Sequence, residues 1–262
     1  MSAIHHLLVA LDGAVATITL NRPELRNAFN DEVIVELTGA FRALDRDDAV
    51  RVIVLAASGT AFCAGADLNW MRRMADYTRE QNLADAAALA EMLRTIASCS
   101  KPVVARVQGD CYAGGMGLVA ACDMAVAVDT AHFCLSEVKL GLVPATISPY
   151  VVRALGARAA QRYMLSAERF DAATAKRLGF VQESVSAEQL DAAVQTLVDA
   201  LLAASPQALA QCKRLLGDVI GQPLDEALIA RTVEHIADAR ASDDGKHGVQ
   251  SFLAKSKPRW LG

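Results

Sequence analysis

Two segments rich in glycine and alanine contain the residues best suited to chemistry carried out by the backbone. They read FCAGADLNW (62–70) and GDCYAGGMGL (109–118). Small side chains let main-chain N–H groups come close to a ligand. The second segment also begins an apolar run that predicts a helix over 114–122, and the first N–H groups of a helix have no partner within it. Two such groups that converge could stabilise a carbonyl oxygen as it gains negative charge.

The same glycines also have a purely structural explanation. A run such as AGGMGL is typical of a helix that packs tightly on its neighbour, because glycine leaves no side chain between them. The spacing G-G-x-G does not match a dinucleotide-binding fingerprint, and no acidic residue follows a next strand at the distance that fingerprint needs. From this motif alone, the binding and the packing interpretations are equally supported.

Glu137 is the best candidate for a side chain that carries a proton. It lies in FCLSEVKLG, where its neighbours Phe133, Leu135, Val138 and Leu140 are apolar. A poorly solvated carboxyl group has a raised pKa, which suits general acid or base catalysis near neutral pH. The alternative is a surface glutamate that begins a turn.

Three apolar segments predict the buried strands that would position these residues. They are RVIVLAA (51–57), PVVARV (102–107) and MAVAV (124–128), continuous runs typical of strands buried on both faces. The predicted helix over 114–122 lies between the second and third, which is the strand–helix–strand order of a parallel sheet. In open α/β sheets the pocket lies beyond the carboxyl ends of the strands, where both glycine-rich segments fall.

Capping signals predict where several helices begin. Asn30 is a candidate N-cap, Ser186 with Gln189 has the spacing of a capping box, and Ser205-Pro206 places a proline at a first helical position. Strand patterns stop after about residue 150. The first part of the chain therefore reads as α/β and the remainder as helical.

Composition narrows the class of protein. The chain has 262 residues, of which 53% are hydrophobic and 21% charged, with a net charge of −4. These values favour one large domain, alone or with a helical appendage, and no basic block indicates a nucleic-acid partner. No apolar run approaches the length of a membrane span. The six cysteines form no C-x-x-C pair, which predicts reduced thiols in a cytoplasmic protein without a metal site.

Taken in order, the motifs of the chain resemble those of the enoyl-CoA hydratase/isomerase (crotonase) family. The resemblance extends over essentially the whole chain and is carried by NRPELRNAFN, AFCAGADL, VQGDCYAGGMGL, CDMAVA, FCLSEVKLGLVP, RYMLSAERFDAATAKRLGFV and FLAKSKPRW. It implies an α/β fold, the crotonase-like spiral of repeated ββα units with a C-terminal helical trimerisation region. The acyl-CoA-binding core would comprise residues 1–195 and the trimerisation region residues 196–262. The assembly would be a homotrimer or a dimer of trimers.

The resemblance also implies a ligand and the residues that hold it. The substrate would be an acyl-CoA thioester, so that coenzyme A is part of the substrate and no separate cofactor is needed. The N–H groups of Ala66 and Gly114 would form the oxyanion hole, and Asp67 would organise its loop by hydrogen bonds to the backbone. The substrate-binding residues would be Arg26, Ala28, Ala64, Ala66, Asp67, Leu68, Gly114, Gly117, Pro144 and Lys255, and Lys255 could serve the site of a neighbouring subunit.

The chain departs from the family pattern at one catalytic position. Family members that hydrate a double bond typically carry two glutamates, of which the second matches Glu137 and the first falls on Gly117. Single-glutamate members include enoyl-CoA isomerases. Two segments, FCAGADLNWM and FCLSEVKLGLVPATISPYVVRALGARAAQRYMLSAERF, look like those of bacterial methylglutaconyl-CoA and isohexenylglutaconyl-CoA hydratases. A glutamate at position 117 would repel the second carboxylate of such a substrate, which glycine would admit.

The sequence therefore predicts an enoyl-CoA hydratase for a branched glutaconyl-type substrate, with Glu137 as the proton carrier. Two alternatives stay open. One is an enoyl-CoA isomerase that uses a single glutamate, and the other is a non-catalytic acyl-CoA-binding member of the family.

Overall fold

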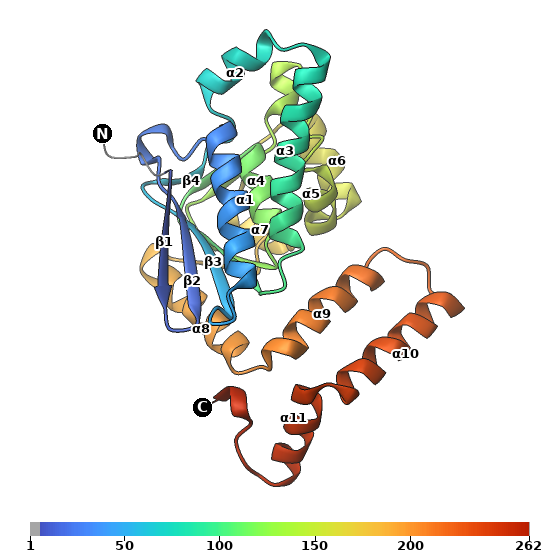
Figure 1. The fold of residues 1–262 in the computed structure, drawn as a ribbon. Coiled ribbons are helices and arrows are strands. Elements are labelled where there is room, and N and C mark those ends of the chain that lie inside the picture. The colour runs from blue at the N-terminus through green and yellow to red at the C-terminus, as the bar shows by residue number, and fades with distance from the viewer. Residues whose placement is uncertain (1–5, 262) are drawn as a thin grey trace.

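Two β-sheets form the centre of the structure, a computed structural model that describes residues 6–261 (Figure 1). The larger sheet has the order β1-β2-β3-β5-β7-β10 and the smaller the order β4-β6-β8-β9. The strands of the larger sheet are β1 (Leu7–Asp12), β2 (Val15–Leu20), β3 (Val52–Ala57), β5 (Val103–Val107), β7 (Met124–Val128) and β10 (Glu183–Val185). Those of the smaller sheet are β4 (Ala61–Cys63), β6 (Asp110–Tyr112), β8 (His132–Cys134) and β9 (Phe170–Asp171).

The chain alternates between the two sheets. β3 continues into β4, β5 into β6 and β7 into β8, and each pair is followed by one or more helices. The strands pair in parallel except in the β1–β2 hairpin and between β8 and β9. This repetition is the expected spiral of ββα units. All six residues of β3 are buried, as its continuous apolar sequence predicts.

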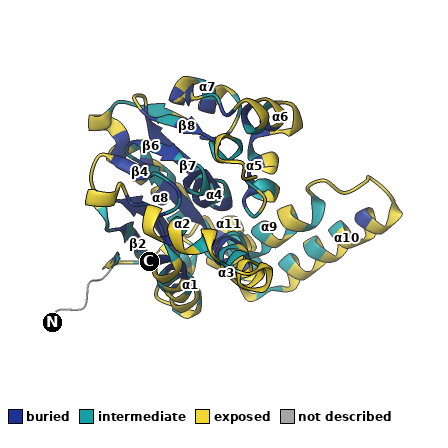
Figure 2. Ribbon diagram, turned by 90° about the horizontal axis from the view of Figure 1, so that it is seen from above, coloured by how far each residue is buried: buried dark blue, intermediate teal, exposed yellow. Residues whose placement is uncertain are grey.

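Helices surround the sheets, and one of them runs through the interior. The α-helices are α1 (Asp31–Arg46), α2 (Leu68–Ala75), α3 (Arg79–Ala97), α4 (Gly114–Ala121), α5 (Ser148–Leu155), α6 (Ala157–Ser166), α7 (Ala172–Arg177), α8 (Leu190–Leu202), α9 (Pro206–Val219), α10 (Glu226–Ala241) and α11 (Asp243–Leu253). The 3₁₀ turns are η1 (Pro23–Leu25), η2 (Glu137–Leu140), η3 (Ala187–Gln189) and η4 (Arg259–Leu261). Figure 2 shows α4 mostly buried and enclosed by other elements.

The N-caps expected at Asn30 and Ser205 are confirmed. Asn30 accepts a hydrogen bond from Val33 N (3.0 Å), and Ser205 accepts one from Ala208 N (3.0 Å). The capping box expected from Ser186 and Gln189 is wrong, because residues 187–189 form a 3₁₀ turn and the Ser186 hydroxyl donates to Glu188 instead. The expectation of no strands after residue 150 is also wrong, since β9 and β10 lie there.

The C-terminal helices α9, α10 and α11 extend away from the sheets (Figure 1). The expected division at 195/196 falls inside α8, whose Val194 and Val198 are buried and belong to the core beside β5 and β7. The helices that extend away from the sheets therefore begin with α9, after the end of α8. Lys213 on α9 contacts the core, since its Nζ atom lies 2.6 Å from the Asp123 carboxylate, which also accepts a hydrogen bond from Val103 N.

Among residues 6–261, no helix combines the length and the hydropathy needed to span a membrane.

Candidate active site

Three consecutive strands of the smaller sheet end side by side at the expected site. β4, β6 and β8 are parallel neighbours, with Cys63 paired to Cys111 and Tyr112 paired to Cys134. Ala66, Gly114 and Glu137 follow the ends of these strands by three, two and three residues. Because parallel strands point their carboxyl ends to the same edge, the sheet brings the three predicted groups to one place.

The loop that contains Ala66 is held on both sides by Phe29. Phe29 N donates to Gly65 O and Asp67 N donates to Phe29 O, both at 2.9 Å, which makes a short parallel bridge to Ala66. Between these two bonds, the Ala66 N–H donates to no protein oxygen within residues 6–261. The bridge thus fixes the peptide and leaves its N–H available to a ligand.

The turn from β6 into α4 presents the second N–H. Ala113 N donates to Cys134 O at 2.8 Å, and Ala113 itself has φ 46° and ψ −123°, a conformation that L-residues rarely adopt. Gly114 follows as the first residue of α4, where its N–H has no acceptor earlier in the helix. A Cβ built on Gly65 would lie 3.9 Å from Gly114 N, so the two loops are in contact.

Glu137 begins the turn η2 and has no hydrogen-bond partner for one carboxyl oxygen. Its Oε2 atom is buried and accepts no bond from any described residue. Burial raises the pKa of the Glu137 carboxyl above its usual value, only partly opposed by a hydrogen bond from its own backbone. This is the poorly solvated carboxyl group that its apolar neighbours predict, and it can exchange a proton with a bound molecule.

Each glycine of the α4 segment has a different neighbour that excludes a side chain. A Cβ at Gly114 would lie 2.5 Å from Phe29 Cζ, one at Gly115 would lie 2.8 Å from Cys63 Cβ, and one at Gly117 would lie 2.8 Å from Ile147 Cβ. The packing interpretation therefore accounts for all three. A side chain at Gly114 would meet the Phe29 ring rather than block a ligand directly.

The expectation that Gly117 makes room for a substrate carboxylate is wrong. Gly117 is buried within α4, and the space that its side chain would use is filled by Ile147, itself 2% exposed. Position 117, at which the resemblance places the first glutamate of hydratases, is thus packed against an apolar side chain. The glycine opens no volume for a substrate carboxylate.

The structure brings most of the predicted substrate-binding residues to the same edge. Ala64 N donates to Arg26 O at 3.0 Å, which joins the 22–28 loop to the Ala66 loop, and Ala28 is buried in that loop. Leu68 begins α2 and is 70% exposed. Pro144 is half-buried between η2 and α5.

Lys255 is exposed and follows α11, a helix that lies at the far end of the molecule from α2 in Figure 1. Within this chain it is not part of the site.

Asp67 organises its loop, as its position predicts. Its carboxylate caps α2 by accepting bonds from Asn69 N (2.8 Å) and Trp70 N (3.3 Å), and it pairs with Arg22 (2.8 Å). Burial raises the pKa of the Asp67 carboxyl, but hydrogen bonds from Arg22 and these N–H groups outweigh it and hold the pKa below its usual value. Arg22 and Phe29 are the two residues at the site that the sequence analysis missed, although both lie in the quoted segment NRPELRNAFN.

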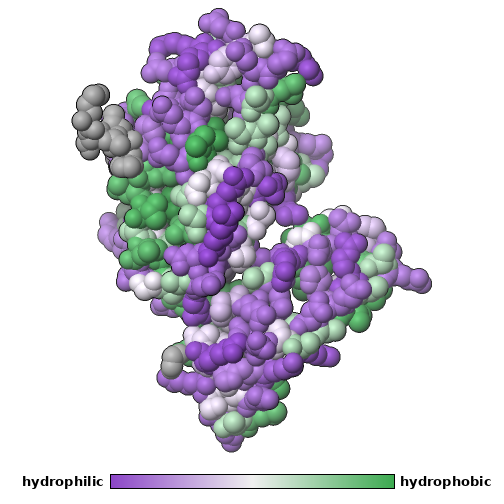
Figure 3. All heavy atoms as spheres, in the orientation of Figure 1, coloured by the Kyte–Doolittle hydropathy of each residue, from purple (hydrophilic) through white to green (hydrophobic). Residues whose placement is uncertain are grey.

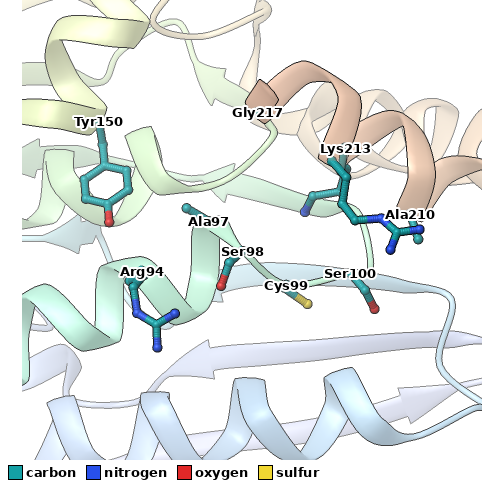
Figure 4. A pocket seen from close by; sticks show the side chains of 10 residues that line it. Arg94, Ala97, Ser98, Cys99, Ser100, Tyr150, Ala210, Lys213 and Gly217 are labelled. Carbon is teal, nitrogen blue, oxygen red and sulfur yellow. The ribbon is translucent and has the colours of Figure 1, made fainter. Parts of the chain in front are cut away.

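A separate cavity of about 460 Å³ lies between α3, α5 and α9. Arg94 and Tyr150 face Lys213 across it in Figure 4. An adjoining cavity is lined by residues 120–124 and so lies at the opposite end of α4 from Gly114. Arg94 is already paired with Glu91, and Lys213 with Asp123. These cavities lie at the boundary between α9 and the core.

No group of three or more His, Cys, Asp or Glu side chains within residues 6–261 is arranged to hold a metal ion.

Comparisons with known proteins show what the chain is similar to. The model of the enoyl-CoA hydratase/isomerase family matches residues 11–262. A solved enoyl-CoA hydratase from Shewanella pealeana has a TM-score of 0.96 and 44% identity, covering 98% of this chain and 97% of its own. Enoyl-CoA hydratase ACTT6 of Alternaria alternata is 34% identical over 92% of this chain and 78% of its own. The 1,2-epoxyphenylacetyl-CoA isomerase of Escherichia coli is 30% identical over 98% of each chain.

Proposed function

Because this chain belongs to the enoyl-CoA hydratase/isomerase family, we propose that it adds water across the double bond of an enoyl-CoA thioester. The observation that carries the proposal is the buried, unpaired Glu137 oxygen at the same sheet edge as two free backbone N–H groups. This arrangement provides a proton carrier and an oxyanion site, the two elements that the reaction needs.

In the proposed reaction, Glu137 acts as both base and acid. Its carboxylate takes a proton from water as the water oxygen bonds to C3 of the enoyl group. The electron pair of the double bond moves to the thioester oxygen, where the Ala66 and Gly114 N–H groups stabilise the negative charge. Glu137 then returns the proton to C2, which restores the thioester. One carboxyl group suffices because the proton it removes is the proton it delivers.

The substrate proposed is a branched glutaconyl-CoA, and its support is the sequence resemblance described above. The packing of Ile147 against Gly117 leaves no open volume there for the second carboxylate of such a substrate. The substrate preference is therefore tested directly, by comparing kcat/KM for 3-methylglutaconyl-CoA and crotonyl-CoA.

A second candidate function is isomerisation, and the glycine at position 117 favours it. With a single glutamate, Glu137 could remove a proton from C2 of a 3-enoyl-CoA and return it to C4, without water. Hydration of a 2-enoyl-CoA lowers the absorbance of the conjugated thioester, whereas isomerisation of a 3-enoyl-CoA creates it. Turnover of the 3-enoyl-CoA alone would establish the isomerase, and no turnover of any of these thioesters would leave a binding protein.

We also propose that the C-terminal helices mediate assembly into a trimer or a dimer of trimers. On α10, Ile229, Val233 and Ile236 are spaced at i, i+4 and i+7 and are 52%, 59% and 49% exposed. An exposed apolar stripe of this kind is typical of an interface between subunits. In Figure 3, apolar residues interrupt the largely hydrophilic surface of these helices.

A further inference from the structure

Arg22 and Asp67 form an ion pair that is almost completely removed from solvent. Their side chains are 12% and 6% exposed, and Arg22 Nη2 lies 2.8 Å from Asp67 Oδ2 across 45 residues of sequence. A pair in this position loses the hydration of both charges, so its stability depends on further hydrogen bonds. Both partners make them.

The Arg22 guanidinium binds two loops at once. While Nη2 contacts Asp67, Nη1 donates to Ala28 O at 2.6 Å. The second Asp67 oxygen is occupied by the N–H groups of Asn69 and Trp70 at the start of α2. The guanidinium thus connects the 22–28 loop to the residue that immediately follows Ala66.

The 22–28 loop is itself rigidly attached to the sheet. Asn27 is 2% exposed and has φ 55°; its side-chain amide donates to Ser58 O (2.7 Å) and Ala61 O (2.9 Å), and its oxygen accepts from Arg22 N (2.9 Å). Because the loop that contains Arg22 is fixed in this way, Arg22 holds Asp67 in a fixed position relative to the sheet. An ion pair between two loops is directional, which hydrophobic contact would not be.

The segment held by Arg22 also contacts both residues whose N–H groups form the proposed oxyanion site. Phe29 follows the Arg22-bound Ala28, forms the backbone bridge to Ala66, and places its ring against Gly114. A shift of the 22–29 segment would therefore tilt the Ala66 peptide and loosen the contact at Gly114.

We propose that Arg22 is a positioning residue for the reaction: by pairing with Asp67 and binding Ala28 O, it aims the Ala66 N–H at the thioester oxygen. This inference rests on the proposed use of that N–H, and it assigns Arg22 no contact with the substrate. A small misplacement of a reacting group can lower a rate by about 10²-fold.

The test compares Arg22→Met and Asp67→Asn with Arg73→Met. Asp67→Asn keeps a capping oxygen but removes the charge that faces Arg22. Arg73→Met is the matched control, because it breaks an arginine–aspartate pair between α2 and α1 in which both side chains are about half exposed. We expect Arg22→Met and Asp67→Asn to lower kcat for crotonyl-CoA by about 10- to 10²-fold with KM changed less than about threefold. Arg73→Met should match the wild type.

A spectroscopic measurement separates positioning from a general loss of structure. A bound dienoyl-CoA absorbs at longer wavelength when hydrogen bonds polarise its thioester carbonyl. This red shift should occur with the wild type and with Arg73→Met, and should shrink in both pair variants at saturating ligand. If Arg22→Met does not fold, Asp67→Asn alone is compared with Arg73→Met and the wild type.

The outcomes also distinguish this inference from the proposed function. A red shift that is lost in the pair variants supports the inference even if the wild type hydrates no enoyl-CoA, in which case the proposed function fails. Wild-type turnover with an unchanged red shift and kcat in the pair variants would overturn the inference and leave the function in place. A loss in Arg73→Met equal to that in Arg22→Met would overturn it as well.

Discussion

At the scale of single residues, the burial of Glu137 makes it the centre of the proposed chemistry. We expect Glu137→Gln to lower kcat by at least about 10²-fold while acyl-CoA binding is retained, because the amide keeps the size but cannot exchange the proton. Steady-state rates and isothermal titration with a CoA thioester measure the two effects. A variant with near-wild-type kcat would show that another group carries the proton.

The same substitution should stabilise the protein in a pH-dependent way. The raised pKa means that folded Glu137 keeps its proton to a higher pH than the unfolded chain does. Stability is then lost as pH rises through the folded pKa. Glu137→Gln removes that loss, so the free energy of unfolding of the variant should exceed that of the wild type at neutral pH. The difference between the two should shrink as the pH falls and become constant below 4.5, the ordinary pKa of a glutamate carboxyl.

Urea unfolding between pH 4 and pH 8 measures this difference, with the exposed Glu234→Gln as the control. A gap between Glu137→Gln and wild type that does not change with pH would contradict the assignment of a raised pKa to Glu137.

Gly117 and Ile147 should behave as one packing unit. Gly117→Ala is expected to lower the free energy of unfolding by about 1–3 kcal/mol through overpacking, and Ile147→Ala by about 2–5 kcal/mol through a cavity. Because each change relieves the other, the double variant should lose at least about 1 kcal/mol less than the sum.

A helical glycine without a close neighbour provides the control for this cycle. A Cβ on Gly39 in α1 would meet no atom within 4 Å. Gly39→Ala should therefore stabilise the chain, by up to about 1 kcal/mol. Strict additivity of the Gly117 and Ile147 changes would mean that Ile147 does not fill the space of the missing side chain.

At the scale of elements, the turn between β6 and α4 stores backbone strain where the Gly114 N–H is presented. Ala113 adopts φ 46° and ψ −123°, which costs an L-residue about 1–3 kcal/mol. Ala113→Gly removes this strain but adds freedom to the unfolded chain, worth about 0.5–1 kcal/mol. The net expectation is a gain of about 1 kcal/mol in the free energy of unfolding, measured by urea titration. A loss of stability would show that the Ala113 side chain contributes more by packing than its backbone costs.

The elements also show why the site is assembled reliably. The residues that follow β4, β6 and β8 meet because these strands pair in parallel as neighbours in one sheet. The helix α4 then leaves the sheet edge through a core that tolerates no side chain at three of its positions. The position of its first N–H is consequently fixed by the packing along the whole helix.

At the scale of the whole molecule, the exposed stripe on α10 predicts an oligomer. Wild-type protein should elute with the mass of a trimer or a hexamer in light-scattering chromatography. Val233→Asp places a charge within the stripe and should yield smaller species, since a buried unpaired charge is unfavourable. Glu234→Gln, on the same helix, should leave the mass unchanged. A monomeric wild type would refute the proposed role of the C-terminal helices.

The sequence by itself determined what depends on neighbouring residues. Continuous apolar runs predicted β3, β5 and β7, and the side chains of Asn30 and Ser205 cap the helices that they were expected to begin. The apolar neighbours of Glu137 predicted its poor solvation. The motif order predicted the family and the spiral fold, because the ββα units follow one another along the chain.

Only the tertiary structure decided what depends on segments far apart. The short strands β9 and β10 exist because they pair with β8 and β7, and a two- or three-residue segment carries no pattern of its own. The Arg22–Asp67 pair joins residues that no local spacing connects. The reason for Gly117 also came from a distant residue, since Ile147 reaches it from the start of α5. A sequence can show that a side chain is absent, but only packing shows which neighbour takes its space.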